Sequence, residues 1–158
     1  MSNRFRGSFD VKIDERGRIK IPVRFLEVFD AAYSRQLFLT SLNGESVLLY
    51  PIRVWEGMEQ RVEHLGVWDP DIDDYFSRLS YWGVESEIDL KGRILIPPAL
   101  RNSCQLNDTI RIMGKATHLS LWNEEVFRAK EMGEPFSKEK VHRVSRLLHE
   151  ASPLFGDE

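Results

Sequence analysis

The chain has 158 residues, of which 42% are hydrophobic and 30% are charged, and its net charge is −3. This composition supports a core of one domain or two small ones and argues against a disordered chain. No stretch approaches the roughly 20 apolar residues of a membrane span, the N-terminus lacks the apolar run of a secretory signal, and the single cysteine, Cys104, cannot form an internal disulfide. We therefore expect a soluble cytoplasmic protein.

The charge is unevenly distributed along the chain. Residues 1–26 hold seven basic and three acidic residues, residues 27–90 hold four basic and thirteen acidic residues, and residues 91–101 hold three basic residues and no acidic one. Two basic islands about 75 residues apart, in an otherwise acidic chain, indicate an internal repeat.

The repeat is clear when the islands are aligned. Residues 13–22 lie over residues 88–97 without a gap, and seven of the ten positions are identical. A looser match follows, because 37–40 resembles 110–113 and 47–55 resembles 119–127. The sequence thus predicts four parts: a first repeat (8–54), linker helices (55–83), a second repeat (84–127) and a C-terminal helical tail (128–158).

Each repeat is predicted to run strand, turn, strand, short helix and two further strands. Phe9, Val11 and Ile13 alternate with polar residues, as in a half-buried strand. The turn at 14–17 is followed by a second short strand, and Pro22 is suited to open a helix over 23–29. The second repeat predicts a helix over 98–103. Because neither repeat has enough strands alone, we expect a mainly β, α+β fold in which both form one pseudo-two-fold barrel.

Three more helices are predicted outside the repeats. Apolar residues at helical spacing follow Pro51, Asp69 and Pro70 are typical of a helix start, and Ser137 is suited to cap the last helix. The apolar stripe of that last helix consists of Val141, Val144, Leu147 and Leu148.

The repeated motif carries an aspartate four residues before an arginine, as Asp14 with Arg18 and as Asp89 with Arg93. In one hypothesis the glycine permits the turn, the aspartate fixes the turn or orients the arginine, and the guanidinium projects from the tip to bind phosphate or guanine. In the other, the pair is a salt bridge that stabilises a hairpin. One copy alone would favour the salt bridge, whereas two copies inside two basic islands, taken together with the family resemblance described below, favour DNA contact.

Other candidate sites are weaker. Asp69, Asp71, Asp73 and Asp74 lack the glycine and glutamate of a calcium loop and indicate an acidic helix start. His142 and His149 have no evident third ligand, and Cys104 is interpreted as a buried thiol. We therefore expect no metal, cofactor, small-molecule substrate or catalytic site.

The paired Asp-x-x-Gly-Arg-x-x-x-Pro motifs, together with residues 5–7, 82–85 and 96–101, resemble the MraZ transcriptional regulators of the AbrB-like, swapped-hairpin superfamily. The resemblance covers about residues 5–127. It implies a bacterial regulator, cytoplasmic and associated with the nucleoid, that assembles into a homo-oligomeric ring. It also implies binding to short direct repeats in double-stranded DNA, in the promoter of the division and cell-wall gene cluster.

From the motif and the resemblance together, the expected DNA-binding residues are Arg16, Arg18, Lys20, Arg24, Lys91, Arg93 and Arg101. The expected turn-orienting residues are Asp14, Gly17, Asp89 and Gly92. Leu26 departs from the family, which commonly has a second arginine at that position. The alternative function is a ring-forming protein-interaction module whose basic hairpins bind an acidic partner.

Overall fold

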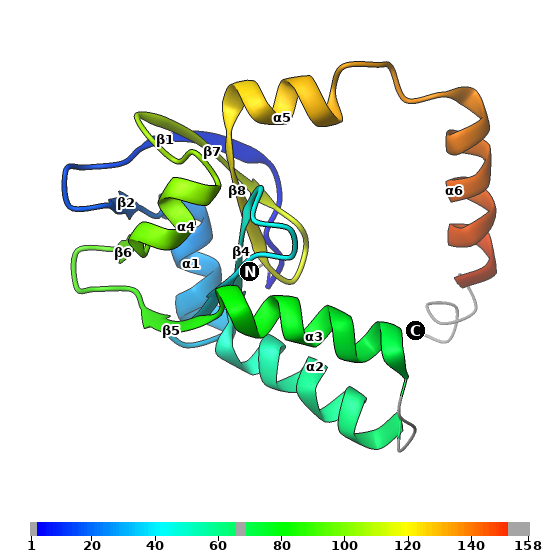
Figure 1. Cartoon of the computed structure of the whole chain (residues 1–158), viewed down its shortest axis with the longest axis horizontal. Helices are drawn as coiled ribbons and strands as arrows, with labels where there is room; N and C mark the ends of the chain where they lie inside the picture. The colour runs from blue at the N-terminus through cyan, green and yellow to red at the C-terminus, as the bar shows by residue number, and fades with distance from the viewer. Residues whose placement is uncertain (1–2, 66–68, 152–158) are drawn as a thin grey trace. The chain divides into compact units, whose positions relative to one another are not determined.

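The computed structural model describes residues 3–65 and 69–151 and has an α+β fold (Figure 1). The first repeat comprises β1 (Ser8–Lys12), β2 (Arg18–Lys20), α1 (Val23–Ala32), β3 (Gln36–Thr40) and β4 (Val47–Pro51). The linker holds α2 (Ile52–Leu65) and α3 (Pro70–Trp82). The second repeat comprises β5 (Val84–Glu87), β6 (Arg93–Leu95), α4 (Pro98–Ser103), β7 (Thr109–Gly114) and β8 (Leu119–Asn123). Helices α5 (Glu124–Glu131) and α6 (Lys138–Ala151) follow.

The two repeats exchange strands. The main sheet has the order β1-β7-β8-β4-β3-β5, and the paired neighbours are antiparallel. The first strand of each repeat therefore lies at an edge and pairs with a strand of the other repeat: β1 with β7, and β5 with β3. The order stays the same when the equivalent strands of the repeats are interchanged, so the exchange is pseudo-symmetric.

The predicted barrel is wrong, because this sheet is open and ends at β1 and β5. The physical reason lies in the remaining two strands. β2 and β6 pair with each other as a separate two-stranded sheet, with Ile19 opposite Ile94. Strands that could have extended or closed the main sheet instead satisfy their hydrogen bonds across the pseudo-two-fold axis.

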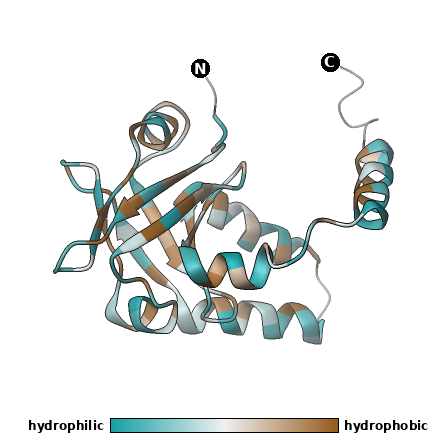
Figure 2. Ribbon diagram, turned by 90° about the horizontal axis from the view of Figure 1, so that it is seen from above, coloured by the Kyte–Doolittle hydropathy of each residue, from teal (hydrophilic) through white to brown (hydrophobic). Residues whose placement is uncertain are grey.

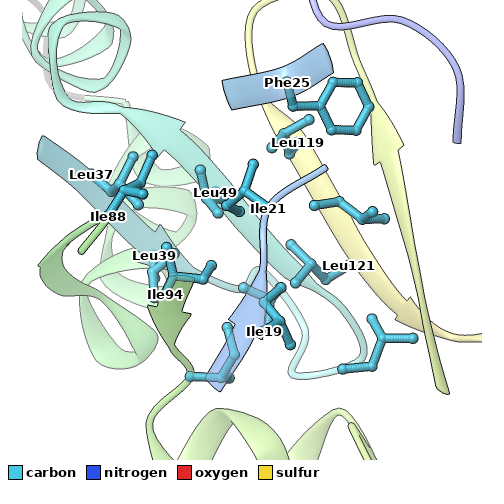
Figure 3. Close-up of a cluster of buried hydrophobic side chains, with 14 of the residues drawn as sticks. Ile19, Ile21, Phe25, Leu37, Leu39, Leu49, Ile88, Ile94, Leu119 and Leu121 are labelled. Carbon is cyan, nitrogen blue, oxygen red and sulfur yellow. The ribbon is translucent and has the colours of Figure 1, made fainter. Parts of the chain in front are cut away.

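One hydrophobic core contains residues of both repeats. Figure 3 shows Ile19, Ile21 and Phe25 of the first repeat among Ile88, Ile94 and other apolar side chains. Phe5 is also buried, and its ring lies 5.8 Å from that of Phe25. A repeat separated from its partner would expose its half of this core to water, which is why the halves fold together.

The linker helices form a second, smaller cluster against the sheet. Trp55 of α2 stacks on Phe38 of β3 at 4.3 Å between ring centroids, and Leu79 of α3 is fully buried. Asp69 accepts hydrogen bonds from the backbone N–H groups of Asp71 and Ile72, so it caps α3 as the sequence predicts. Within the described ranges, no helix is long and apolar enough to cross a membrane.

The described residues up to Val126 form one compact unit, and those from Phe127 onward form a second. In the second unit, the Ser137 side chain accepts a hydrogen bond from Lys140 N–H at the start of α6. The predicted apolar stripe of α6 is exposed, and Figure 2 shows hydrophobic and hydrophilic residues alternating along this helix.

Candidate nucleic-acid interface

The first hairpin consists of β1, the turn at 14–17 and β2. One carboxylate oxygen of Asp14 accepts the backbone N–H groups of Arg16 and Arg18, both at 2.9 Å. The other carboxylate oxygen accepts a hydrogen bond from Nε of Arg18 at 3.0 Å. Gly17 completes the turn with φ +85°, in the left-handed region that favours glycine. Asp14 therefore holds both the backbone of the turn and the arginine side chain.

The second hairpin, which consists of β5, the turn at 89–92 and β6, has the same geometry. Asp89 accepts the backbone N–H groups of Lys91 at 2.9 Å and of Arg93 at 2.8 Å, and Nε of Arg93 at 3.2 Å. Gly92 has φ +77°. The identical bond pattern shows that the shared sequence motif encodes one local structure twice.

The hydrogen bonds to each aspartate also set its charge state. The pKa of Asp14 is lowered, first by the backbone N–H of Arg18, with further contributions from the Arg18 side chain and the Arg16 backbone. The pKa of Asp89 is lowered first by the backbone N–H of Arg93. Because Asp14 and Asp89 remain ionised at neutral pH, each can fix the Nε side of its arginine.

The arginines do not project from the hairpin tips. The side chains of Arg18 and Arg93 are only 26% and 29% exposed, and they line one surface hollow of about 460 Å³. Within the described residues, the hydrogen bonds of each guanidinium run from Nε alone, so neither terminal Nη group is bonded to another described residue. The tips themselves are formed by exposed residues: Glu15 and Arg16 in the first hairpin, and Leu90 and Lys91 in the second.

The hollow is not a simple anion site. It is also lined by Glu85, Glu87 and Asp89, so the carboxylates outnumber the two guanidinium groups. A phosphate would be repelled inside it, whereas a neutral base edge would not. The hollow therefore carries charges of both signs, and the exposed cations Arg16, Lys20 and Lys91 lie outside its lining.

Because the repeats exchange strands, a basic residue of each repeat lies against the hairpin of the other. Arg101 of α4 donates from Nε to the Ile96 carbonyl oxygen at 2.9 Å, and its guanidinium covers the first hairpin: a Cβ built on Gly17 would lie 2.5 Å from its Cζ. Lys20 of β2 lies opposite Arg93 of the second hairpin. Each repeat thus supplies a cation to the hairpin of the other.

The same exchange explains the position of Leu26. Its Cδ2 atom would lie 3.2 Å from a Cβ on Gly92, so Leu26 packs on the second hairpin although it belongs to the first repeat. It is the counterpart of Arg101, which covers Gly17 in the first hairpin. Leu26 therefore lies at the second hairpin, where the first repeat also places Lys20.

The remaining expected DNA-binding residue, Arg24, lies apart from this arrangement. It is exposed in the first turn of α1, and no hydrogen bond or ion pair joins its guanidinium to another described residue. Of the seven expected residues, the structure therefore brings six to the two hairpins or onto them and leaves Arg24 on a neighbouring helix.

The weaker candidate residues include two exposed histidines and one buried cysteine. His142 and His149 are exposed, and no group of three potential metal ligands occurs among residues 3–65 and 69–151. Cys104 is 1% exposed, and burial raises the pKa of its thiol to about 11, as expected for an inert buried cysteine.

Sequence reasoning missed one residue that supports the second hairpin. Arg35 donates from Nη1 to the Asp89 carbonyl oxygen at 2.9 Å and is held by an ion pair with Asp30 at 3.0 Å. Its backbone carbonyl accepts the N–H of Ile88, just as Asp108 accepts the N–H of Ile13. Aligning 37–40 with 110–113 places Arg35 over Asp108, so the repeat alignment held a signal for this contact.

Comparison with known proteins identifies the family. A family model described as "MraZ protein, putative antitoxin-like" matches residues 83–146. A transcriptional regulator MraZ from Acidobacterium capsulatum is 33% identical over 143 residues, which cover 90% of this chain and 98% of the relative. The chain belongs to the MraZ family. MraZ regulators from Koribacter versatilis (31%) and Shewanella sp. strain ANA-3 (32%) also align with 90% of the chain, covering 98% and 96% of their own lengths.

Membership of the MraZ family gives the two hairpins a functional context. The relatives are named transcriptional regulators, which supports a DNA-binding regulator. The hairpins combine paired arginines, exposed cations and turns fixed by hydrogen bonds.

Proposed function

We propose that this chain is a sequence-specific DNA-binding regulator of transcription that contacts duplex DNA through its two hairpins. The observation that carries the proposal is the pairing of β2 with β6, which joins two hairpins of identical geometry and brings Arg18 and Arg93 to one hollow. Figure 1 shows both hairpin turns at the same end of the unit, away from α2 and α3. The two turns can therefore approach one DNA duplex together.

The charged side chains divide into two groups. Arg18 and Arg93 are each oriented by an aspartate, and the carboxylates that line their hollow disfavour phosphate. The two arginines are therefore suited to base edges, where arginine pairs with guanine O6 and N7. Arg16, Lys20 and Lys91 are exposed and suited to phosphates. In this scheme the first group determines sequence preference and the second provides salt-dependent affinity.

The proposal extends to the operator and the assembly. Copies of the chain associate into a ring in the cytoplasm, at the nucleoid, and neighbouring copies bind successive short direct repeats in the promoter of the division and cell-wall gene cluster. Once one copy is bound, the next engagement is intramolecular, which can raise avidity by roughly 10²–10⁴. Binding to a single repeat is then weak and binding to several is strong.

The experiment titrates the protein against fluorescent duplexes selected by it from a random pool, with one or several copies of the selected site, at two salt concentrations. Arg18→Ala and Arg93→Ala should each lose about 1–3 kcal/mol per site and relax sequence preference. Arg16→Ala should weaken binding to all duplexes evenly and reduce the salt dependence.

The matched control is Arg78→Ala. Arg78 is an exposed arginine in an ion pair with an aspartate four residues away, but it lies on α3, in the acidic linker. The Arg78→Ala variant should bind DNA as the wild type does. If Arg18→Ala and Arg93→Ala bind like Arg78→Ala, the hairpin pairs are structural. If no duplex is selected at all, the protein-interaction alternative replaces the proposal.

A further inference from the structure

The two hairpins have the same backbone but different tips. The residue after the aspartate is Glu15 in the first turn and Leu90 in the second, and the next residue is a cation in both. The bonds that define each turn come from backbone N–H groups, the aspartate and the arginine, and neither Glu15 nor Leu90 donates to the aspartate. The difference between the tips is therefore not explained by folding.

At two equivalent positions the other repeat supplies the same pair of residue types to each hairpin. Around the first, the other repeat places Arg101 over the glycine and Leu95 opposite the arginine. Around the second, the other repeat places Leu26 over the glycine and Lys20 opposite the arginine. Each hairpin thus receives one cation and one leucine at these two positions. The second also receives Arg35, which donates to the Asp89 carbonyl oxygen on the strand side of the turn, and the exposed tips differ in Glu15 and Leu90.

Leu90 is fully exposed, at 101%, and it is followed by the exposed cation Lys91. A single exposed leucine is ordinary on a protein surface. This one, however, stands at the tip of the turn between β5 and β6 in the proposed DNA interface, where it would meet the major groove, which is about 12 Å wide. The apolar group that the major groove offers to a leucine is the C5-methyl of thymine.

We propose that Leu90 contacts a thymine methyl group in the major groove, and that Glu15 gives the first hairpin no such contact. The inference rests on the proposed DNA-binding function. Its consequence is polarity: although the backbone is pseudo-symmetric, the two hairpins read different bases, so each copy binds DNA in one direction. Direct repeats require such a fixed direction, whereas a symmetric pair would favour palindromes.

The test replaces thymine by deoxyuridine in the selected duplex, which removes the methyl group and leaves the hydrogen-bonding pattern unchanged. The wild type should lose affinity by about fourfold for each methyl contacted, from the usual free energy of burying one such group. Leu90→Ala should bind the thymine duplex more weakly and should not distinguish the two duplexes. Leu90→Met should restore the distinction, and Glu15→Ala, the matched control, should retain it.

The outcomes separate this inference from the function on which it rests. Equal wild-type affinity for the thymine and deoxyuridine duplexes overturns the inference and leaves DNA binding intact. Leu90→Ala could instead bind both duplexes more weakly, still distinguish them and form a smaller assembly in light scattering. That result would place Leu90 in a contact between subunits and would also overturn the inference. If the wild type binds neither duplex, the proposed function itself fails.

Discussion

The two hairpins of this chain share one hydrogen-bond pattern, yet they are completed by different residues. In each, an aspartate holds two backbone N–H groups and one arginine Nε, and a glycine with positive φ closes the turn. The residue that covers the glycine is Arg101 in one hairpin and Leu26 in the other. The comparison shows that the motif fixes local geometry, whereas the partner repeat decides which side chains surround it.

The largest expected loss of stability comes from core substitutions, which test whether the two repeats contribute equally to the hydrophobic core. Ile19 and Ile94 lie opposite each other, and each is 1% exposed. Ile19→Ala and Ile94→Ala should each lower the free energy of unfolding by about 2–5 kcal/mol, by similar amounts. Urea unfolding at one protein concentration measures both, and Val23→Ala, at a 65% exposed position, is the control. Clearly unequal losses would show that the symmetry is geometric but not energetic.

The turn glycines give the next largest effect. Gly17→Ala and Gly92→Ala each force a side chain into the left-handed region and should cost about 1–2 kcal/mol. Gly17→Ala also displaces the Arg101 guanidinium, so it alone should weaken DNA binding at the first hairpin. Gly57→Ala, within α2 with open space around its Cα, should instead stabilise the protein by about 0.5–1 kcal/mol. Thermal unfolding and DNA titration distinguish the three variants.

The aspartates should show the pH dependence of the hairpins. The pKa values of Asp14 and Asp89 are lowered, so their contribution to stability is present at neutral pH and is lost as the pH falls below about 4 and through the folded pKa. NMR titration of the two carboxyl groups checks this. Because the backbone N–H of residue 18 is the first cause and that of residue 16 also contributes, Arg18→Ala should retain part of the lowering of the Asp14 pKa. A return of that pKa to its ordinary value would show that the side-chain ion pair dominates.

Exchanging the tips should have the smallest effect on stability. Glu15→Leu and Leu90→Glu alter exposed residues that take no part in the turn bonds, so each should change the free energy of unfolding by no more than about 0.5 kcal/mol. Chemical denaturation measures this directly. A loss of unfolding free energy comparable to that of the glycine variants would mean that the tip residues stabilise the turns. The difference between the hairpin tips would then be explained by folding.

Much of the fold could be predicted from local sequence. The order of elements within each repeat, the helix at Pro98–Ser103 and the capped start of α3 all match the structure, because turns, caps and apolar periodicity act over a few residues. The predicted helix over 23–29 continues to Ala32. The barrel could not have been rejected in this way, since an alternating strand pattern is equally compatible with an open and a closed sheet.

Within the candidate site, the sequence by itself determined the two Asp–Arg turns. An aspartate two and four residues before backbone N–H donors, and a glycine free to adopt positive φ, produce the same geometry twice without distant contacts. Only the tertiary structure decided that Arg101 lies on the first hairpin, that Lys20 and Leu26 lie at the second, and that Arg18 and Arg93 share one hollow. The reason is that these neighbours are set by strand exchange between segments about 75 residues apart, and local propensities do not select one partner strand over another.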